Sequence, residues 1–195
     1  MDDGSQLQAC EDALAQSRAE TRAAFENRAL MYAYLYEELS EELDAEQAAD
    51  VMKRAIYRRG LEIGQKYRAA GDAGDLAEVA RIFCEGSPCE GALFEPGVEE
   101  APGAVADAAP TANGEPAGPA GRLVLRMTEC PLVDAWQAAG YDAAQVDRLC
   151  EIASAVDEGT FAAAGLELTF LERKAQPGAC RCLLELRVPG RAEKD

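Results

Sequence analysis

Histidine is absent from the 195 residues of this chain. Its absence excludes Ser-His and Cys-His nucleophile pairs, His-ligated metals and HExxH-type motifs, because each of these needs an imidazole as base or ligand. Any proton transfer must therefore use a carboxylate, a tyrosine or a metal-bound water.

Basic residues are also scarce, with 19 Lys and Arg against 36 Asp and Glu, so the formal net charge is −17. Binding to a phosphate backbone needs a basic surface, and an anionic membrane would repel this chain. No apolar run approaches the roughly 20 residues of a membrane span. We therefore expect neither a nucleic acid nor a membrane as a partner.

The first residues, Met1 to Gly4, are acidic where a secretory signal would carry positive charge before an apolar run. We therefore predict a cytoplasmic, reducing location, in which the seven cysteines are free thiols.

Three regions follow one another along the chain. Residues 1–85 are rich in Ala, Glu, Arg and Leu without an interrupting proline, which predicts a helical half with a break between Ser40 and Asp44. Gly60 and Gly64 lie inside the second predicted helix, where they indicate close approach of another backbone. Residues 86–121 hold six of the nine prolines and predict a flexible linker or insertion.

The region 122–190 changes from helical periodicity to alternation. Leu123, Leu125 and Met127 alternate with other residues and predict a strand. Two helices follow, the first beginning at Pro131 and the second capped by Asp142, and then two strands that form a hairpin. The order is β-α-α-β-β after a helical half, which predicts an α+β fold with helices packed on an antiparallel sheet.

Three cysteines of this region occupy informative positions. Cys130 lies where a strand gives way to a helix start, where free amides and the helix dipole favour a thiolate. Cys150 is on the apolar face of the next helix, and Cys182 begins a strand on the same face as Leu184. We expect the three sulfurs to converge, in which case they would suit zinc, or an iron–sulfur cluster with a fourth sulfur from elsewhere. The alternative is that these cysteines only pack in the core, as free cysteines usually do.

Asp157 is the strongest carboxylate candidate. It follows Cys150 by two helical turns and is predicted to end this helix, where the dipole disfavours a negative charge. Either it has a chemical role there, or it only binds a turn amide.

The sequence resembles the L-2-amino-thiazoline-4-carboxylic acid hydrolase family. The resemblance rests on the helical stretch from Asn27 to Gly64 and on a set of residues after the linker, namely Cys130-Pro131, Trp136, Gly140, Cys150, Asp157 and Gly178-x3-Cys182. The Gly-x3-Cys strand entry is also similar to 4-vinyl-reductase-type small-molecule-binding domains. Two features depart from the family pattern, Ala179 where an acidic residue is expected and an unusually long insertion before Arg122.

The resemblance implies a hydrolase that opens the ring of a cyclic aminothiazoline acid with water to give S-carbamoyl-cysteine. Cys130 would be nucleophile or metal ligand, Cys150 and Cys182 metal ligands or thiol partners, and Asp157 an acid/base or orienting group. An anionic substrate needs a cation, for which Arg126 and Arg28 are the candidates.

Two other hypotheses remain open. The first is a non-catalytic module that binds a metal, a cluster or a small ligand. The second is a helical interaction protein with inert cysteines. The helical half could also pair with a second copy to form a homodimer.

Overall fold

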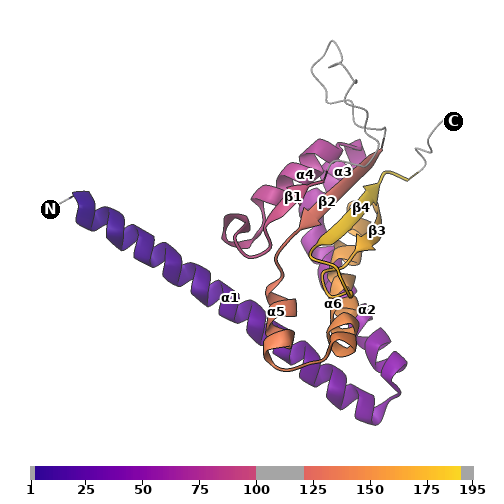
Figure 1. The fold of residues 1–195 in the computed structure, drawn as a ribbon. Coiled ribbons are helices and arrows are strands. Elements are labelled where there is room, and N and C mark those ends of the chain that lie inside the picture. Colours follow the sequence, from indigo (N-terminus) through magenta and orange to yellow (C-terminus); the bar gives the residue numbers. More distant parts are fainter. Residues whose placement is uncertain (1–2, 100–120, 190–195) are drawn as a thin grey trace.

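The computed structural model describes residues 3–99 and 121–189, and it shows an α+β fold with helices on one face of an antiparallel sheet (Figure 1). The helical half contains α1 (Asp3–Glu42), α2 (Ala45–Gly64), a 3₁₀ turn η1 (Gln65–Tyr67), α3 (Arg68–Ala73) and α4 (Leu76–Glu85). The second half contains β2 (Arg122–Met127), α5 (Pro131–Ala138), α6 (Ala143–Ala163), β3 (Glu167–Glu172) and β4 (Cys182–Arg187). The predicted β-α-α-β-β order is confirmed.

One more strand is present than the sequence indicated. Residues 86–99, which we expected to belong to the linker, form a 3₁₀ turn η2 (Pro88–Gly91) and the strand β1 (Pro96–Val98). β1 pairs with β2, and the sheet order is β1-β2-β4-β3, with every neighbouring pair antiparallel. A three-residue strand is too short to show alternation, and its proline mimics a linker. The other linker residues, 100–120, lie outside the described residues.

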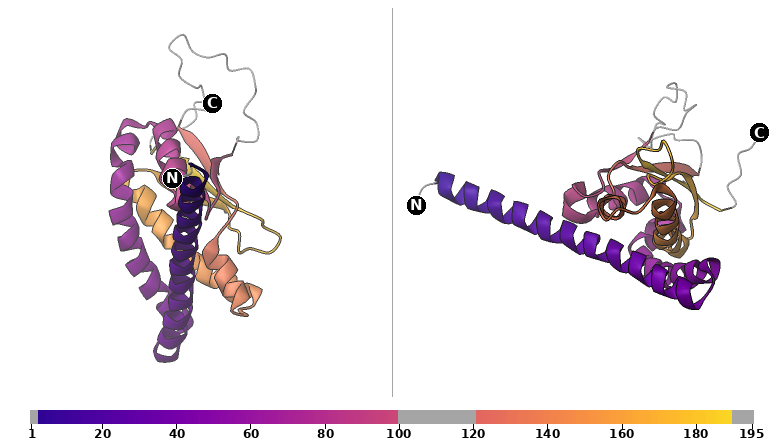
Figure 2. Two further views of the ribbon diagram at one scale, coloured as in Figure 1. Left: turned by 90° about the vertical axis from the view of Figure 1, so that its left-hand side faces the viewer. Right: turned by 60° about the horizontal axis from the view of Figure 1, so that its bottom comes forward.

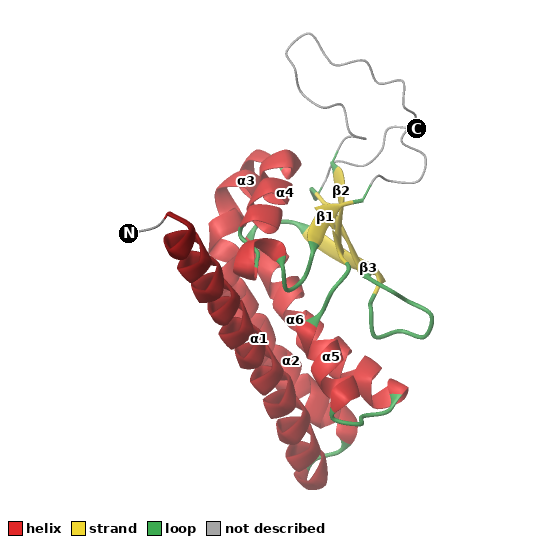
Figure 3. Ribbon diagram, turned by 60° about the vertical axis from the view of Figure 1, so that its left-hand side comes forward, coloured by secondary structure: helices red, strands yellow, loops and turns green. Residues whose placement is uncertain are grey.

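The helices lie on one side of the sheet, as Figure 3 shows in red and yellow. The sheet residues facing them are alternate positions of β2 and β4, among them Leu125 and Leu184, which are completely buried. Met127 pairs with Cys182 across the β2–β4 ladder, so both side chains lie at the same end of this face. Sheet register therefore decides which end of the core receives the Cys182 sulfur.

Capping residues set where the helices begin. Asp44 accepts hydrogen bonds from two amides at the start of α2, and Asp142 forms a full capping box with Gln145 at the start of α6. Trp136 of α5 is fully buried and donates its indole N–H to the Ala29 carbonyl of α1 at 2.7 Å. This bond attaches α5 to the long first helix.

The first helix extends beyond the rest of the fold. In Figures 1 and 2 the N-terminal part of α1 projects away from the other elements. Exposed apolar side chains of that part include Leu7 and Leu14. Pairing of two chains through the helical half stays a prediction. None of the helices described, α1 included, is both long enough and apolar enough to cross a membrane.

Glycines allow α2 and α6 to pack backbone against backbone. A Cβ atom added at Gly60 would lie 2.2 Å from the Val156 carbonyl oxygen, and one at Gly159 would lie 2.1 Å from the Tyr57 carbonyl oxygen. Gly64 is equally close to the Thr160 carbonyl. The close approach that Gly60 and Gly64 indicated is therefore confirmed, and α6 supplies the partner backbone.

We expect the substitution Gly60→Ala to lower the free energy of unfolding by at least about 3 kcal/mol, because the added methyl group meets a carbonyl oxygen that cannot rotate away. The loss should exceed the gain of about 1 kcal/mol in helix propensity. Urea unfolding followed by circular dichroism measures it. Arg58→Ala, at an exposed position of the same helix, is the control, and equal midpoints for the two variants would contradict the packing argument.

Candidate active site

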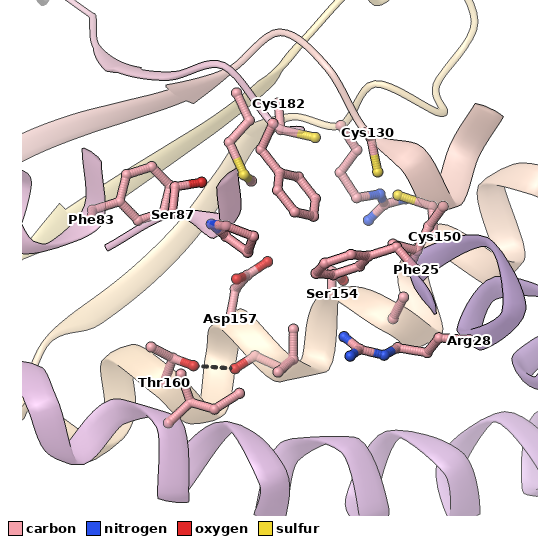
Figure 4. Close-up of a pocket in the computed structure, with 18 of the residues that line it drawn as sticks. Phe25, Arg28, Phe83, Ser87, Cys130, Cys150, Ser154, Asp157, Thr160 and Cys182 are labelled. Carbon is pink, nitrogen blue, oxygen red and sulfur yellow. Dashed lines mark hydrogen bonds between the residues drawn. The ribbon is translucent and has the colours of Figure 1, made fainter. Parts of the chain in front are cut away.

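A cavity of about 450 Å³ lies between the helices and one end of the sheet (Figure 4). Side chains of α1, α2, α4, α5, α6, β2, β3 and β4 and of the loops between them line it. The predicted residues Cys130, Cys150, Asp157 and Cys182 are all among the lining residues. The fold thus brings together three sulfurs and one carboxyl that are far apart in the sequence.

Each sulfur reaches the cavity from a different element. Cys130 is the residue before α5, with an extended backbone that turns its side chain toward the cavity, and Cys150 lies on the buried side of α6. Cys182 opens β4, and its sulfur accepts a hydrogen bond from the Lys174 amide at 3.3 Å. In Figure 4 the Cys130 and Cys150 sulfurs lie side by side, with Cys182 beyond them.

All three thiols are held in the neutral form. Burial raises the pKa of Cys150 to about 12, and the nearby Cys182 and Cys130 groups add to the increase. Burial likewise raises the pKa of Cys182 to about 11, although the Lys174 amide opposes the change. The expectation of a thiolate at Cys130 is wrong, because desolvation raises the pKa of this thiol by more than the amides of Val133 and Leu132 lower it.

The three sulfurs are not arranged as the ligands of a metal ion in the described part of the chain. Among residues 3–99 and 121–189, no group of three or more Cys, Asp or Glu side chains is placed to hold a metal ion. Cys180 is exposed, and neither it nor Cys84 lines the cavity, so no fourth sulfur is supplied from those positions. Zinc or an iron–sulfur cluster stays a prediction that this side-chain arrangement does not favour.

The prediction that Asp157 ends its helix is wrong, because α6 continues to Ala163. In Figure 4 the Asp157 side chain points into the centre of the cavity. Burial, followed by the neighbouring charge of Glu158, raises the pKa of its carboxyl from 3.8 to about 7. A carboxyl with a pKa near neutrality can both accept and donate a proton at pH 7. Asp157 is thus the group in this cavity that is suited to proton transfer, the work that histidine does in other proteins.

Of the two predicted cations, Arg28 lines the cavity and Arg126 does not. Arg28 lines the cavity at its edge and lies over the Phe25 ring, 4.6 Å from its centroid. Arg126 does not line the cavity, because it alternates with the core-facing Leu125 and Met127, and it pairs with Glu99 at 3.5 Å. The cations that sequence reasoning missed are Arg59, Lys66 and Arg173. Nothing in their local sequence distinguishes them from surface residues, since only the fold brings them to this cavity.

One comparison with known proteins gives a match. The sequence profile of the family described as L-2-amino-thiazoline-4-carboxylic acid hydrolase matches residues 22–184, which include every cavity residue named above. No curated protein matches the chain significantly.

The substitution Asp157→Asn should stabilise the protein at pH 8, on the order of 2 kcal/mol, since one pKa unit corresponds to about 1.4 kcal/mol and water in the cavity screens part of the effect. The folded-state pKa of about 7 lies above the ordinary 3.8. Stability from this group is therefore complete below about pH 4 and is lost as the pH rises through 7. Unfolding curves at pH 5 and pH 8 should show that Asp157→Asn stabilises the protein much less at pH 5 than at pH 8. Asp50→Asn, at an exposed position of α2, is the control and should not stabilise the protein at either pH.

The buried thiols should react slowly. We expect iodoacetamide at pH 7.5 to alkylate the exposed Cys10 and Cys180 at least about tenfold faster than Cys150 and Cys182, since the neutral, shielded thiol is a poor nucleophile. Peptide mass spectrometry over time measures each site. Rapid labelling of Cys150 in the folded protein would show that its thiol is ionised or open to solvent.

Proposed function

Because this chain belongs to the L-2-amino-thiazoline-4-carboxylic acid hydrolase family, we propose that it opens small cyclic amidines of this kind with water. The observation that carries the proposal is the Asp157 carboxyl, with a pKa of about 7, inside a cavity that also holds three neutral thiols. The cavity volume of about 450 Å³ is at the small end of the range for ligand pockets, which suits an amino-acid-sized substrate.

The reaction can proceed without histidine. Asp157 in its ionised form accepts a proton from water as the water oxygen bonds to the amidine carbon of the ring. The protonated Asp157 donates this proton to the ring nitrogen. As the carbon–nitrogen bond breaks, the remaining proton of the former water moves from the new hydroxyl to the same nitrogen and the hydroxyl becomes a carbonyl, which yields S-carbamoyl-cysteine. If the carbon–sulfur bond breaks instead, the product is N-carbamoyl-cysteine with a free thiol. The net change in both cases is the addition of one water.

Cys130 supports a second route through the same groups. Its thiol would transfer a proton to Asp157 and bond to the amidine carbon, and the ring carbon–nitrogen bond would break as the nitrogen takes up that proton. Water would then add to the same carbon, and the bond from this carbon to the Cys130 sulfur would break to release the product and restore the thiol. The raised pKa of this thiol means that Asp157 must accept the proton during the attack. Both routes therefore depend on Asp157, whereas only the second depends on Cys130.

We expect the purified protein to convert L-2-amino-thiazoline-4-carboxylate to a product 18 mass units heavier, the mass of water. Asp157→Asn should lower kcat at least about 100-fold, and kcat should change with pH around 7 as this carboxyl titrates. Liquid chromatography with mass detection measures the product, and a thiol reagent tells which ring bond breaks.

The control is Cys180→Ser, at an exposed cysteine outside the cavity, which should keep full activity. Cys130→Ser separates the two routes, since full activity of that variant leaves only direct attack by water. Absence of turnover by the unaltered protein, with metal found by elemental analysis, would instead support the metal-binding module.

A further inference from the structure

The charge of the cavity differs from that of the whole chain. The chain as a whole carries −17, yet the cavity is lined by four cations, Arg28, Arg59, Lys66 and Arg173. Its acidic lining residues are Glu129 and Asp157. Glu129 pairs with Lys174 at 2.9 Å, and the pKa of Asp157, about 7, leaves this carboxyl only partly ionised. The residues that line the cavity therefore carry more positive than negative charge.

Three of the four cations lie where solvent reaches them. Arg28 and Lys66 are exposed, and Arg59 is exposed and pairs with Glu62 at 2.6 Å. Arg28 and Lys66 lie over the rings of Phe25 and Tyr67, and neither forms an ion pair with a described residue. Charges at such positions attract an anion toward the cavity but hold it weakly, because water screens them.

Arg173 is the exception. Its side chain is only 20% exposed, and its charge acts on Cys150, whose pKa it lowers against the larger effect of burial. Its guanidinium makes one ion pair, with Asp147 at 3.0 Å through one terminal nitrogen, and its Nε is buried without a hydrogen bond, so the donors left for a ligand are those of the terminal nitrogens. A shielded guanidinium with unused donors binds a planar carboxylate strongly, because the two groups match in geometry and little water screens them.

We propose that Arg173 binds the carboxylate of a small anionic ligand and so determines which substrates the cavity accepts. The spacing along α6 supports a ligand of amino-acid size. Cys150, beside Arg173, and Asp157 are seven residues apart, so they are separated by about 10 Å along the helix axis. Arg173 and Asp157 both line the cavity, and a small ligand with a polar group at each end can contact both of them.

This assignment rests on the proposed function for the identity of the second end of the ligand, which reacts beside Asp157. Binding of the carboxylate end to Arg173 does not depend on catalysis. An anionic ligand without a ring, or one that is not hydrolysed, would still need a cation to bind its carboxylate in this cavity.

The test compares two probes, L-2-amino-thiazoline-4-carboxylate and 2-amino-2-thiazoline, which has the same ring without the carboxylate. Calorimetry and thermal shift should show that the unaltered protein prefers the carboxylate by about 10- to 100-fold in Kd. Arg173→Gln should remove most of this preference while leaving the Kd of the neutral ring nearly unchanged. Asp147→Asn removes the same ion pair but keeps the guanidinium, so it should retain the preference and controls for lost stability.

L-Proline and L-thiazolidine-4-carboxylate, which carry a carboxylate but no amidine, separate this inference from the proposed function. Binding of these acids that Arg173→Gln abolishes, without ring opening of the thiazoline, would support the carboxylate site and overturn the hydrolase. Ring opening of both thiazolines at equal rates, unchanged in Arg173→Gln, would support the hydrolase and overturn the carboxylate site. Failure of every carboxylate to bind the unaltered protein would overturn the site as well.

Discussion

The packing of α2 against α6 is the contact on which the rest of the structure depends. Glycines at Gly60, Gly64 and Gly159 let the two backbones meet with no side chain between them. The close approach fixes the position of α6, which carries both Cys150 and Asp157 into the cavity. A side chain at any of these glycines would push the two helices apart and let water reach the Asp157 carboxyl.

Shielding decides the chemistry of the cavity. The same loss of water that raises the pKa of Asp157 to about 7 also raises the pKa values of Cys130, Cys150 and Cys182. Burial thus has opposite consequences for the two kinds of acid, since it brings a carboxyl into the useful range and moves a thiol out of it. A chain without histidine obtains in this way a group that can exchange protons near neutral pH.

The distribution of charge is equally a property of the fold. An overall charge of −17 opposes the approach of an anion, while the four cations around the cavity attract one over the last few ångströms. Salt largely screens the repulsion between exposed charges that are more than about 10 Å apart. A buried pair of carboxylate and guanidinium is screened much less. The net charge of the chain is therefore a poor guide to the charge of its ligand when the charged residues are unevenly distributed.

The sequence by itself determined the elements that depend on local rules. The break at Asp44, the cap at Asp142, the hairpin of β3 and β4, the close approach at Gly60 and the family resemblance all follow from residues near one another or from short patterns. Only the tertiary structure decided that Arg173 rather than Arg126 faces the cavity, that β1 completes the sheet, and that the Cys130 thiol is neutral despite its place at a helix start. These features depend on how much water remains around a group and on which distant segment covers it. Neither can be predicted from a local sequence pattern, because both are set by long-range packing.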